Sequence, residues 1–66
     1  MAILKVIEVM ADSSKSWEDA ARNAVSHASK SVKYIKSAFV QSQSVVVKDN
    51  NVTDYRVNVK ITFEVK

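Results

Sequence analysis

The strongest pattern in the chain is an alternation of apolar and polar side chains over residues 55–65. Successive side chains of a β-strand point to opposite faces, so this period of two predicts a strand with one apolar and one polar face. A sheet built on such a strand needs a hydrophobic cover on one side only. The apolar positions are Tyr55, Val57, Val59, Ile61, Phe63 and Val65, and the polar ones are Arg56, Asn58, Lys60, Thr62 and Glu64.

Two further runs indicate extended structure. Residues 3–10 are rich in aliphatic and β-branched side chains, and residues 37–48 form a second such run. The sequence Asp49-Asn50-Asn51 follows, in a chain without glycine or proline. Asparagine and aspartate accept the positive φ angles of tight hairpin turns. We therefore predict a hairpin between residues 37–48 and the alternating run.

A helix is expected between the first two strands. Ser16, with Asp19 three positions later, resembles a capping box. Helical spacing of the apolar residues predicts a helix of about 17–20 residues, roughly 25–30 Å long, with Trp17 as a packing anchor. The apolar stripe consists of Trp17, Ala20, Ala21, Ala24, Val25, Ala28, Val32 and Ile35.

These elements predict an α+β fold with the order β-α-β-β in a single domain, residues 1–66. Strands joined through a helix should be parallel, with a right-handed crossover. The last strand is expected between the other two and antiparallel to the second. The result is a three-stranded, mainly antiparallel sheet wrapped on one helix.

Such a subunit is poorly suited to exist alone. Strands of eleven or twelve residues extend close to about 40 Å, which is longer than the helix that covers them. The sheet edges stay open, and the absence of cysteine excludes disulfide bonds. A chain of 66 residues also buries only a small core. We therefore expect a closed oligomer.

Several functional classes find no support in the sequence. The apolar start is interrupted by Lys5 and Glu8 and is too short to cross a bilayer, so we expect no membrane partner and a cytoplasmic location. The net charge of +3 is spread along the chain without aromatic platforms, which argues against nucleic acid. His27 is the only histidine, with no nucleophile and base around it, so we expect neither catalysis nor a histidine–cysteine metal site.

The hairpin register suggests a site. A two-residue turn at Asp49-Asn50 or Asn50-Asn51 would place Ala38, Val40, Ser42, Ser44 and Val46 on the helix side. It would place Phe39, Gln41, Gln43, Val45 and Val47 on the uncovered side, with Arg56, Asn58 and Lys60. A three-residue loop would reverse these faces. Phe39 and Arg56 are thus candidates for a ligand or subunit contact, or simply surface residues.

The order of motifs resembles the dodecin family over nearly the whole chain. The closing stretch, Tyr55-Arg56-Val57-Asn58-Val59-Lys60-Ile61-Thr62-Phe63, is the most specific. The other matching stretches are Lys5-Val6-Ile7-Glu8-Val9, Ser16-Trp17-Glu18-Asp19-Ala20, Ala28-Ser29-Lys30-Ser31-Val32 and Val45-Val46-Val47-Lys48-Asp49.

This resemblance implies a hollow homododecamer that stores flavin and catalyses nothing. In flavin-binding members the isoalloxazine rings stack between tryptophans, and a glutamine on the last strand bonds the ring edge. Here the tryptophan position falls in Ser37-Ala38-Phe39, and the glutamine position carries Arg56. We therefore expect Phe39 to stack on FMN or riboflavin, with Arg56, Gln41 and Ser37 as further binding residues.

The resemblance also leaves an alternative. Some relatives without the tryptophan are associated with calcium, so the assembly could bind calcium or another small ligand, or be purely structural. Asp54 or Glu64 at subunit contacts would then supply oxygen ligands, although the acids, Asp49 included, lack the spacing of a known calcium loop.

Overall fold

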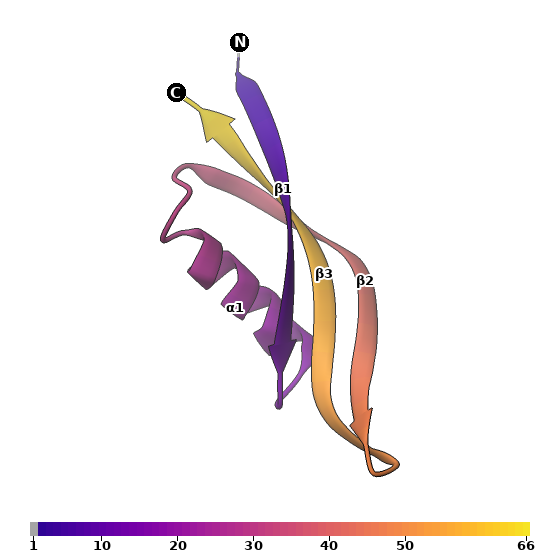
Figure 1. Ribbon diagram of the computed structural model, residues 1–66. Helices are drawn as coiled ribbons and strands as arrows, with labels where there is room; N and C mark the ends of the chain where they lie inside the picture. Colours follow the sequence, from indigo (N-terminus) through magenta and orange to yellow (C-terminus); the bar gives the residue numbers. More distant parts are fainter. Residues whose placement is uncertain (1) are drawn as a thin grey trace.

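The computed structural model describes residues 2–66. Its elements follow the order β1 (Ile3–Ser13), α1 (Trp17–Ala28), β2 (Ile35–Lys48) and β3 (Asn51–Val65). The sheet order is β1-β3-β2, and β3 is antiparallel to both neighbours. The β-α-β-β order and the central position of the last strand are thus confirmed. Helix α1 lies against one face of the sheet, and the β2–β3 hairpin extends beyond it (Figure 1).

The core lies between α1 and the apolar face of β3. Ala20 and Ala24 are fully buried, and so are Val59 and Ile61 across from them. Alanine has no side chain beyond Cβ, so the helix can approach the sheet closely. The predicted alanine stripe and the predicted apolar face of the last strand therefore form the centre of the fold.

The N-terminus of α1 is capped by an extended form of the predicted box. The Ser16 Oγ accepts a hydrogen bond from the Asp19 amide at 3.0 Å. Asp19 is shorter than the glutamate usual at this position, and its Oδ2 instead accepts a hydrogen bond from the Ser13 hydroxyl at 2.6 Å. The Ser13 Oγ in turn accepts from the Lys15 amide at 2.9 Å. Ser13 thus links the end of β1 to the start of the helix.

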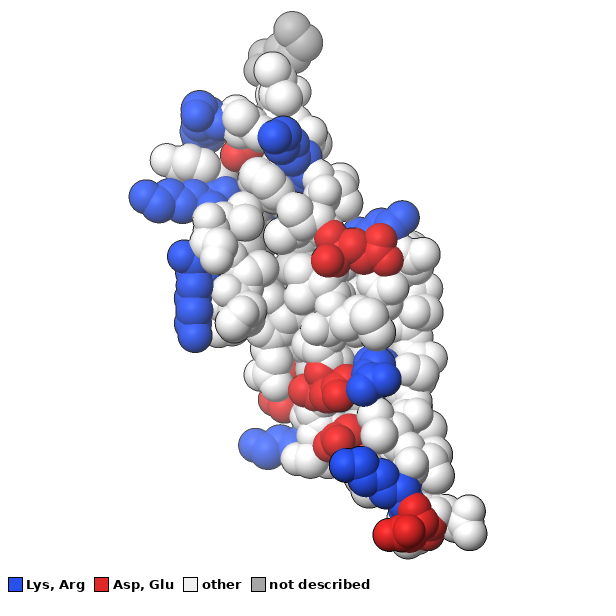
Figure 2. All heavy atoms as spheres, in the orientation of Figure 1, with Lys and Arg blue, Asp and Glu red and all other residues white. Residues whose placement is uncertain are grey.

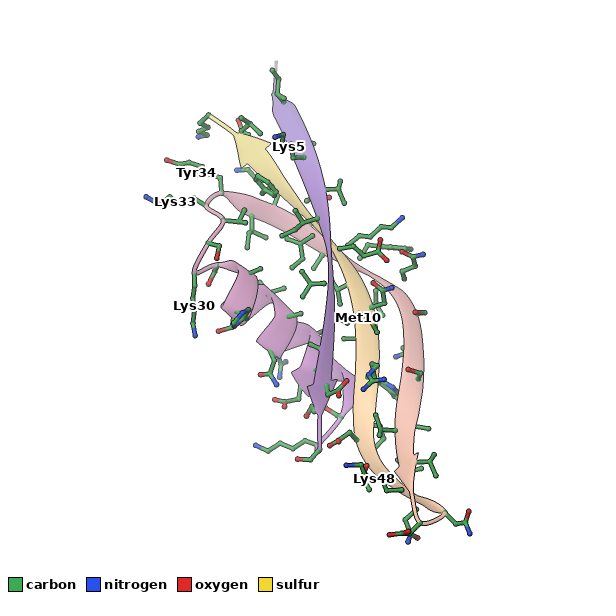
Figure 3. The ribbon with its side chains drawn as sticks, viewed as in Figure 1. Lys5, Met10, Lys30, Lys33, Tyr34 and Lys48 are labelled. Carbon is green, nitrogen blue, oxygen red and sulfur yellow. The ribbon has the colours of Figure 1, made fainter. Side chains whose placement is uncertain are left out.

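The predicted length of the helix is wrong. The helix has 12 residues and ends at Ala28, with Ser29 as its C-cap. Tyr34 has a positive φ of 63°, which redirects the chain, and Ile35 opens β2 instead of continuing the helix. Ile35 still packs against the core, but from the sheet. Lys30 and Lys33 lie on the connection from α1 to β2 (Figure 3).

The hairpin turn has the predicted two-residue form. Asp49 and Asn50 have φ angles of 52° and 63°, and Lys48 pairs with Asn51 across the turn. Positive φ at both central residues matches the twist of the flanking strands. All three strands are longer than predicted, since β1 runs on to Ser13, β2 starts at Ile35 and β3 starts directly after the turn.

The β2–β3 pairing is irregular at three places, at Lys36, Gln41 and Thr53, and the last two irregularities change part of the predicted register. Thr53 is an extra residue in β3, between the pairs Val47–Val52 and Val46–Asp54. Gln41 is an extra residue in β2, between the pairs Val40–Val59 and Ser42–Asn58. Because the bulges lie on opposite strands, the second restores the register that the first displaces. The prediction therefore holds for residues 38–40 and is wrong for residues 42–47.

Residues 42–47 lie on the faces opposite to those that the sequence predicts. Ser42 and Ser44 pair with Asn58 and Arg56, so they lie on the side away from the helix, as does Val46. Gln43 and Val45 pair with Val57 and Tyr55, and they lie on the helix side. A shift of one residue moves every side chain to the opposite face, which accounts for the exchange.

The folded chain is elongated. Its radius of gyration is 13.4 Å, against about 11 Å for a compact domain of this length. It exposes 4911 Å², against about 4,200 Å² for a typical monomer of 7.4 kDa. Most of β2 is exposed, and only Ile35 and Val46 are partly covered. The chain therefore leaves a large part of its sheet without cover. No helix within residues 2–66 is long and apolar enough to cross a membrane.

Candidate functional site

The candidate site is the face of the sheet that points away from α1, which we call the open face. Directly paired residues of antiparallel strands lie on the same side of a sheet, so the pairing defines rows across β1, β3 and β2. Each row contributes one side chain from each strand. The rows are Val6–Thr62–Ser37, Glu8–Lys60–Phe39, Met10–Asn58–Ser42 and Asp12–Arg56–Ser44.

Phe39 is the aromatic residue of this face. Its exposed fraction is 65%, and it lies directly opposite Lys60. Ser37, two residues earlier on β2, lies opposite Thr62 on the same face. Tyr55 and Phe63 are on the helix side, as the alternation predicted. Phe39 therefore presents an uncovered ring beside hydroxyl and ammonium groups.

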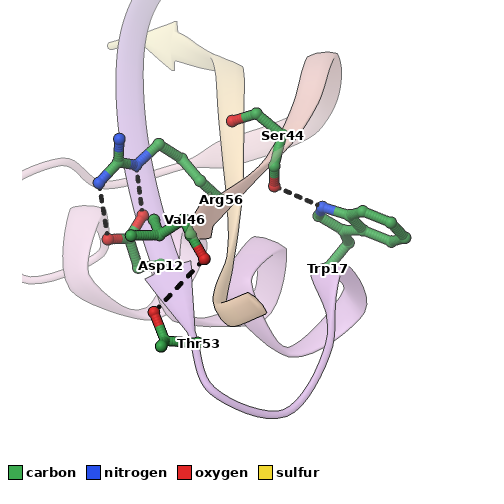
Figure 4. A network of polar contacts seen from close by, with 6 residues as sticks. All are labelled: Asp12, Trp17, Ser44, Val46, Thr53 and Arg56. Atoms are coloured by element: carbon green, nitrogen blue, oxygen red, sulfur yellow. Dashed lines mark hydrogen bonds and ion pairs between the residues drawn. The ribbon is translucent and has the colours of Figure 1, made fainter. Parts of the chain in front are cut away.

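Arg56 lies on the open face but is already engaged by a neighbour. Its Nε donates to Asp12 Oδ1 at 2.7 Å, and its Nη2 donates to Asp12 Oδ2 at 3.1 Å (Figure 4). The hydrogen bond from Arg56 lowers the pKa of the Asp12 carboxyl, and the same contact raises the pKa of Arg56. Two of the five guanidinium N–H groups are used, so three remain for another acceptor.

Arg56 is not next to Phe39. It lies four positions from Lys60 on β3, which corresponds to about 13 Å along the strand. Gln41 is exposed and, as the bulged residue, has no partner in β3, so the strand pairing does not fix its face and its predicted place in the site stays a prediction. Of the four predicted site residues, the structure brings Phe39 and Ser37 together and places Arg56 two rows away.

Three open-face residues were not singled out from the sequence as candidates. Lys60 lies between Glu8 and Phe39 in its row. The Asn58 Nδ2 donates to Glu8 Oε2 at 2.9 Å, while its buried Oδ1 has no partner within residues 2–66. The alternation placed Lys60 and Asn58 on this face. Glu8 could be found only from the pairing of β1 with β3.

Trp17, the single tryptophan, serves the helix side. Its Nε1–H donates to the backbone oxygen of Ser44 at 2.9 Å (Figure 4). Its ring meets Tyr55 edge-on, with centroids 5.2 Å apart and planes at 74°. The indole thus joins the start of α1 to the edge strand β2, which confirms its predicted role as a packing anchor.

The acidic residues do not gather into a metal site. Within residues 2–66, no group of three or more His, Cys, Asp or Glu side chains is placed to hold an ion. Glu64 faces Lys36, whose Nζ is 3.4 Å from its Oε1. Asp54 lies near Arg56 and helps to raise its pKa. One subunit therefore offers scattered carboxylates.

Comparison with known proteins gives a consistent result. The dodecin family model matches residues 3–66. The chain is 35% identical to the calcium dodecin of Mycobacterium tuberculosis over 66 residues, covering 100% of this chain and 93% of the relative.

Solved structures show the same fold. The crystal structure of calcium dodecin from M. tuberculosis is 34% identical, with a TM-score of 0.86 and coverage of 97% of this chain and 91% of the other. Dodecin from Streptomyces coelicolor is 26% identical, with a TM-score of 0.93 and coverage of 98% and 93%.

Proposed function

Because the chain belongs to the dodecin family, whose members are non-enzymatic binding proteins, we propose that it stores a flavin on the open face. The observation that carries this proposal is the exposed ring of Phe39 on an otherwise largely polar surface. An aromatic side chain gains free energy when another ring or apolar surface covers it. The isoalloxazine ring is a planar group that fits such a surface.

The neighbours of Phe39 suit the edge of a flavin ring. Ser37 and Thr62 supply hydroxyl groups that donate or accept hydrogen bonds, and Lys60 supplies donors toward carbonyl oxygens. Gln41, exposed at the bulge next to Ser42, supplies an amide that can donate or accept hydrogen bonds. Arg56 has three free N–H groups but lies two rows away, so we assign it to the far end of the ligand. The flavin itself supplies a redox-active ring, which storage would shield from other reactants.

We propose that the ligand lies between copies of the chain. One subunit, the single domain of residues 1–66, covers only one side of a ring on Phe39. A second copy would cover the other side and also the exposed length of β2. Family members are homo-oligomers, and a closed dodecamer is the form that the resemblance implies. Such contacts would bury part of the surface that one subunit exposes.

The direct test is to denature the purified protein and measure flavin absorbance in the filtrate. The apoprotein is then titrated with riboflavin and FMN while flavin fluorescence is followed. We expect saturable quenching with both the native assembly and the refolded apoprotein. Absence of quenching by either flavin at micromolar protein would reject the proposal.

Calcium is a second candidate, favoured by the 35% identity to a protein named calcium dodecin. Glu64 is held by Lys36, so Asp49 and Asp54 are the carboxylates more available to an ion. Because one subunit gathers too few of them, several copies would have to contribute. Calorimetric titration with Ca²⁺ tests this: binding that is lost in Asp54→Asn supports an ion site, and heat unchanged by that substitution excludes Asp54.

A further inference from the structure

The β2–β3 hairpin projects beyond the helix that covers the middle of the sheet (Figure 1). Trp17, the first residue of α1, reaches the hairpin only as far as Ser44 and Tyr55. From Ser44 to the turn at Asp49 the hairpin continues for about 16 Å. A helix with its side chains is about 10–12 Å across, so the projecting segment is long enough to cover one further helix.

The helix side of this projecting segment is apolar and exposed. Val45 lies opposite Tyr55, and Val47 lies opposite Val52, so the three valines share the side of the sheet on which α1 packs. Their exposed fractions are 40%, 57% and 53%. We call Val45, Val47 and Val52 the hairpin patch. Because α1 packs mainly on β1 and β3 and hardly touches β2, the patch stays uncovered in one subunit.

A second apolar surface lies on α1 itself. Ala21 and Val25 are one helical turn apart, and both are only partly buried. They form the apolar part of a shallow groove of about 390 Å³, which we call the helix groove. The small side chains of Ala20 and Ala24 let α1 approach its own sheet closely. Ala21 allows another surface to approach the helix groove in the same way.

The hairpin patch and the helix groove are different surfaces of one chain, and each copy offers both. A contact between them is therefore heterologous, and its repetition closes a ring when the rotation allows. A single two-fold contact ends at a dimer, so a closed oligomer larger than a dimer needs a second kind of contact. Family members are homo-oligomers, which makes a second copy the partner that such surfaces fit.

We propose that the hairpin patch of one copy packs on the helix groove of a second copy, with Val47 and Val52 covering Ala21 and Val25. The second copy's α1 then lies on the sheet face that the hairpin extends, as a subunit's own α1 lies on β3. This contact is separate from the one proposed around Phe39, because the patch and Phe39 lie on opposite faces of the sheet. It holds whether or not a flavin binds.

A charge placed in the hairpin patch tests this contact. The patch has no charged residue, whereas blue and red atoms lie together at the hairpin tip (Figure 2), where Lys48 and Asp49 follow each other. Val52→Asp would bury a carboxylate between copies. We expect light scattering at micromolar concentration to find the large oligomer replaced by species of at most dimer mass.

The control for this variant is Asn50→Asp, which adds the same charge at the turn and should assemble like the unaltered protein. Circular dichroism should show that the Val52→Asp subunit is still folded, since Val52 is exposed in it. A large oligomer formed by Val52→Asp would overturn the proposal.

Introduced thiols test which surfaces meet, because the chain has no cysteine of its own. Ala21→Cys and Val52→Cys are combined in one chain, and the native oligomer is treated with a short bismaleimide. A denaturing gel should show covalent products larger than a dimer, since each copy is linked to two others. Each single variant is a control and can give dimers at most.

Absence of products larger than a dimer in the doubly substituted oligomer would overturn the pairing of the hairpin patch with α1. This holds even if Val52→Asp disrupts assembly, because another surface of the second copy would then cover the valines. Both results are independent of flavin titrations, so failure of this contact and failure of the flavin function are distinguished.

Discussion

Arg56 and Asp12 join the central strand β3 to the edge strand β1 through two parallel hydrogen bonds, of 2.7 and 3.1 Å. Arg56 occupies the position where the family resemblance predicts a ligand contact. The structure shows that this side chain already has a partner 44 residues away in sequence. Its first role is therefore to fix the open face, and any ligand meets an arginine whose orientation and charge Asp12 has set.

This contact predicts a defined pH dependence. Arg56 holds the pKa of Asp12 below its ordinary value of 3.8, so the pair contributes stability above that pH and loses it as pH falls through the lowered pKa. NMR titration of the Asp12 carboxyl should give a midpoint below 3.8. In Arg56→Gln the midpoint should return toward that value. A midpoint that is the same in both proteins would show that the contact is absent in solution.

Phe39 should control flavin affinity. Offset contact between two rings contributes about 0.5–1.5 kcal/mol beyond burial, so Phe39→Ala should weaken binding roughly tenfold. Phe39→Trp should strengthen binding and quench flavin fluorescence more completely, because indole is larger and a better electron donor. Val47→Ala, at another exposed apolar residue of β2, is the control and should bind as before. Equal affinity of Phe39→Ala and the unaltered protein would remove the main reason for preferring flavin to an ion.

The alanine stripe of α1 should tolerate no charge. Ala24 has no exposed surface, so Ala24→Asp would bury a carboxylate against β3, at a cost of about 3–5 kcal/mol. We expect loss of assembly or a large drop in melting temperature. Ser26→Asp adds the same charge at an exposed position of the same helix and should cost only a few tenths of a kcal/mol, about the size of an unfavourable charge near a helix C-terminus. Similar melting temperatures for both variants would contradict the packing described.

Trp17 should matter for β2 more than for the helix. In Trp17→Phe an aromatic ring remains near Tyr55, but the 2.9 Å hydrogen bond to the Ser44 carbonyl is lost. A hydrogen bond of this kind contributes about 1 kcal/mol to stability. Urea unfolding should detect the loss, and hydrogen exchange should increase in residues 42–46 more than in α1. Uniform change across the chain would mean that the indole only fills space.

The sequence predicts the elements of this fold better than their ends. The alternation of residues 55–65 is clear because β3 is the central strand, with one face against the helix along its length. The end of α1 is different. Val32 and Ile35 continue the helical spacing, but Ile35 packs equally well from a strand. Tyr34 has a positive φ angle, which a glycine or asparagine would have indicated in the sequence and a tyrosine does not.

The residues of the open face could be predicted only in part, because the sequence does not mark the bulges that shift the strand register. The bulges at Gln41 and Thr53 carry no glycine, so nothing in composition marks them, and each reverses the faces that follow. Phe39 was placed correctly because the two shifts cancel before it. Glu8 and Asp12 were not assigned, since β1 has apolar Val6 and Met10 among its open-face residues and shows no clean alternation. Their role appears only when β1 is paired with β3.

The subunit should assemble into a closed oligomer. The subunit exposes more surface than a typical monomer of its mass, and its two edge strands, β1 and β2, are both unpaired on their outer sides. Exposed large apolar side chains such as Val6, Met10 and Phe39 add to this surface. Burying them between copies would lower the free energy by about 25 cal/mol for each Å² of apolar area. Light scattering at micromolar concentration should therefore find a large closed oligomer, with a dodecamer as the expected form. A stable folded monomer under those conditions would refute the prediction, because the six buried residues of the subunit core would then suffice alone.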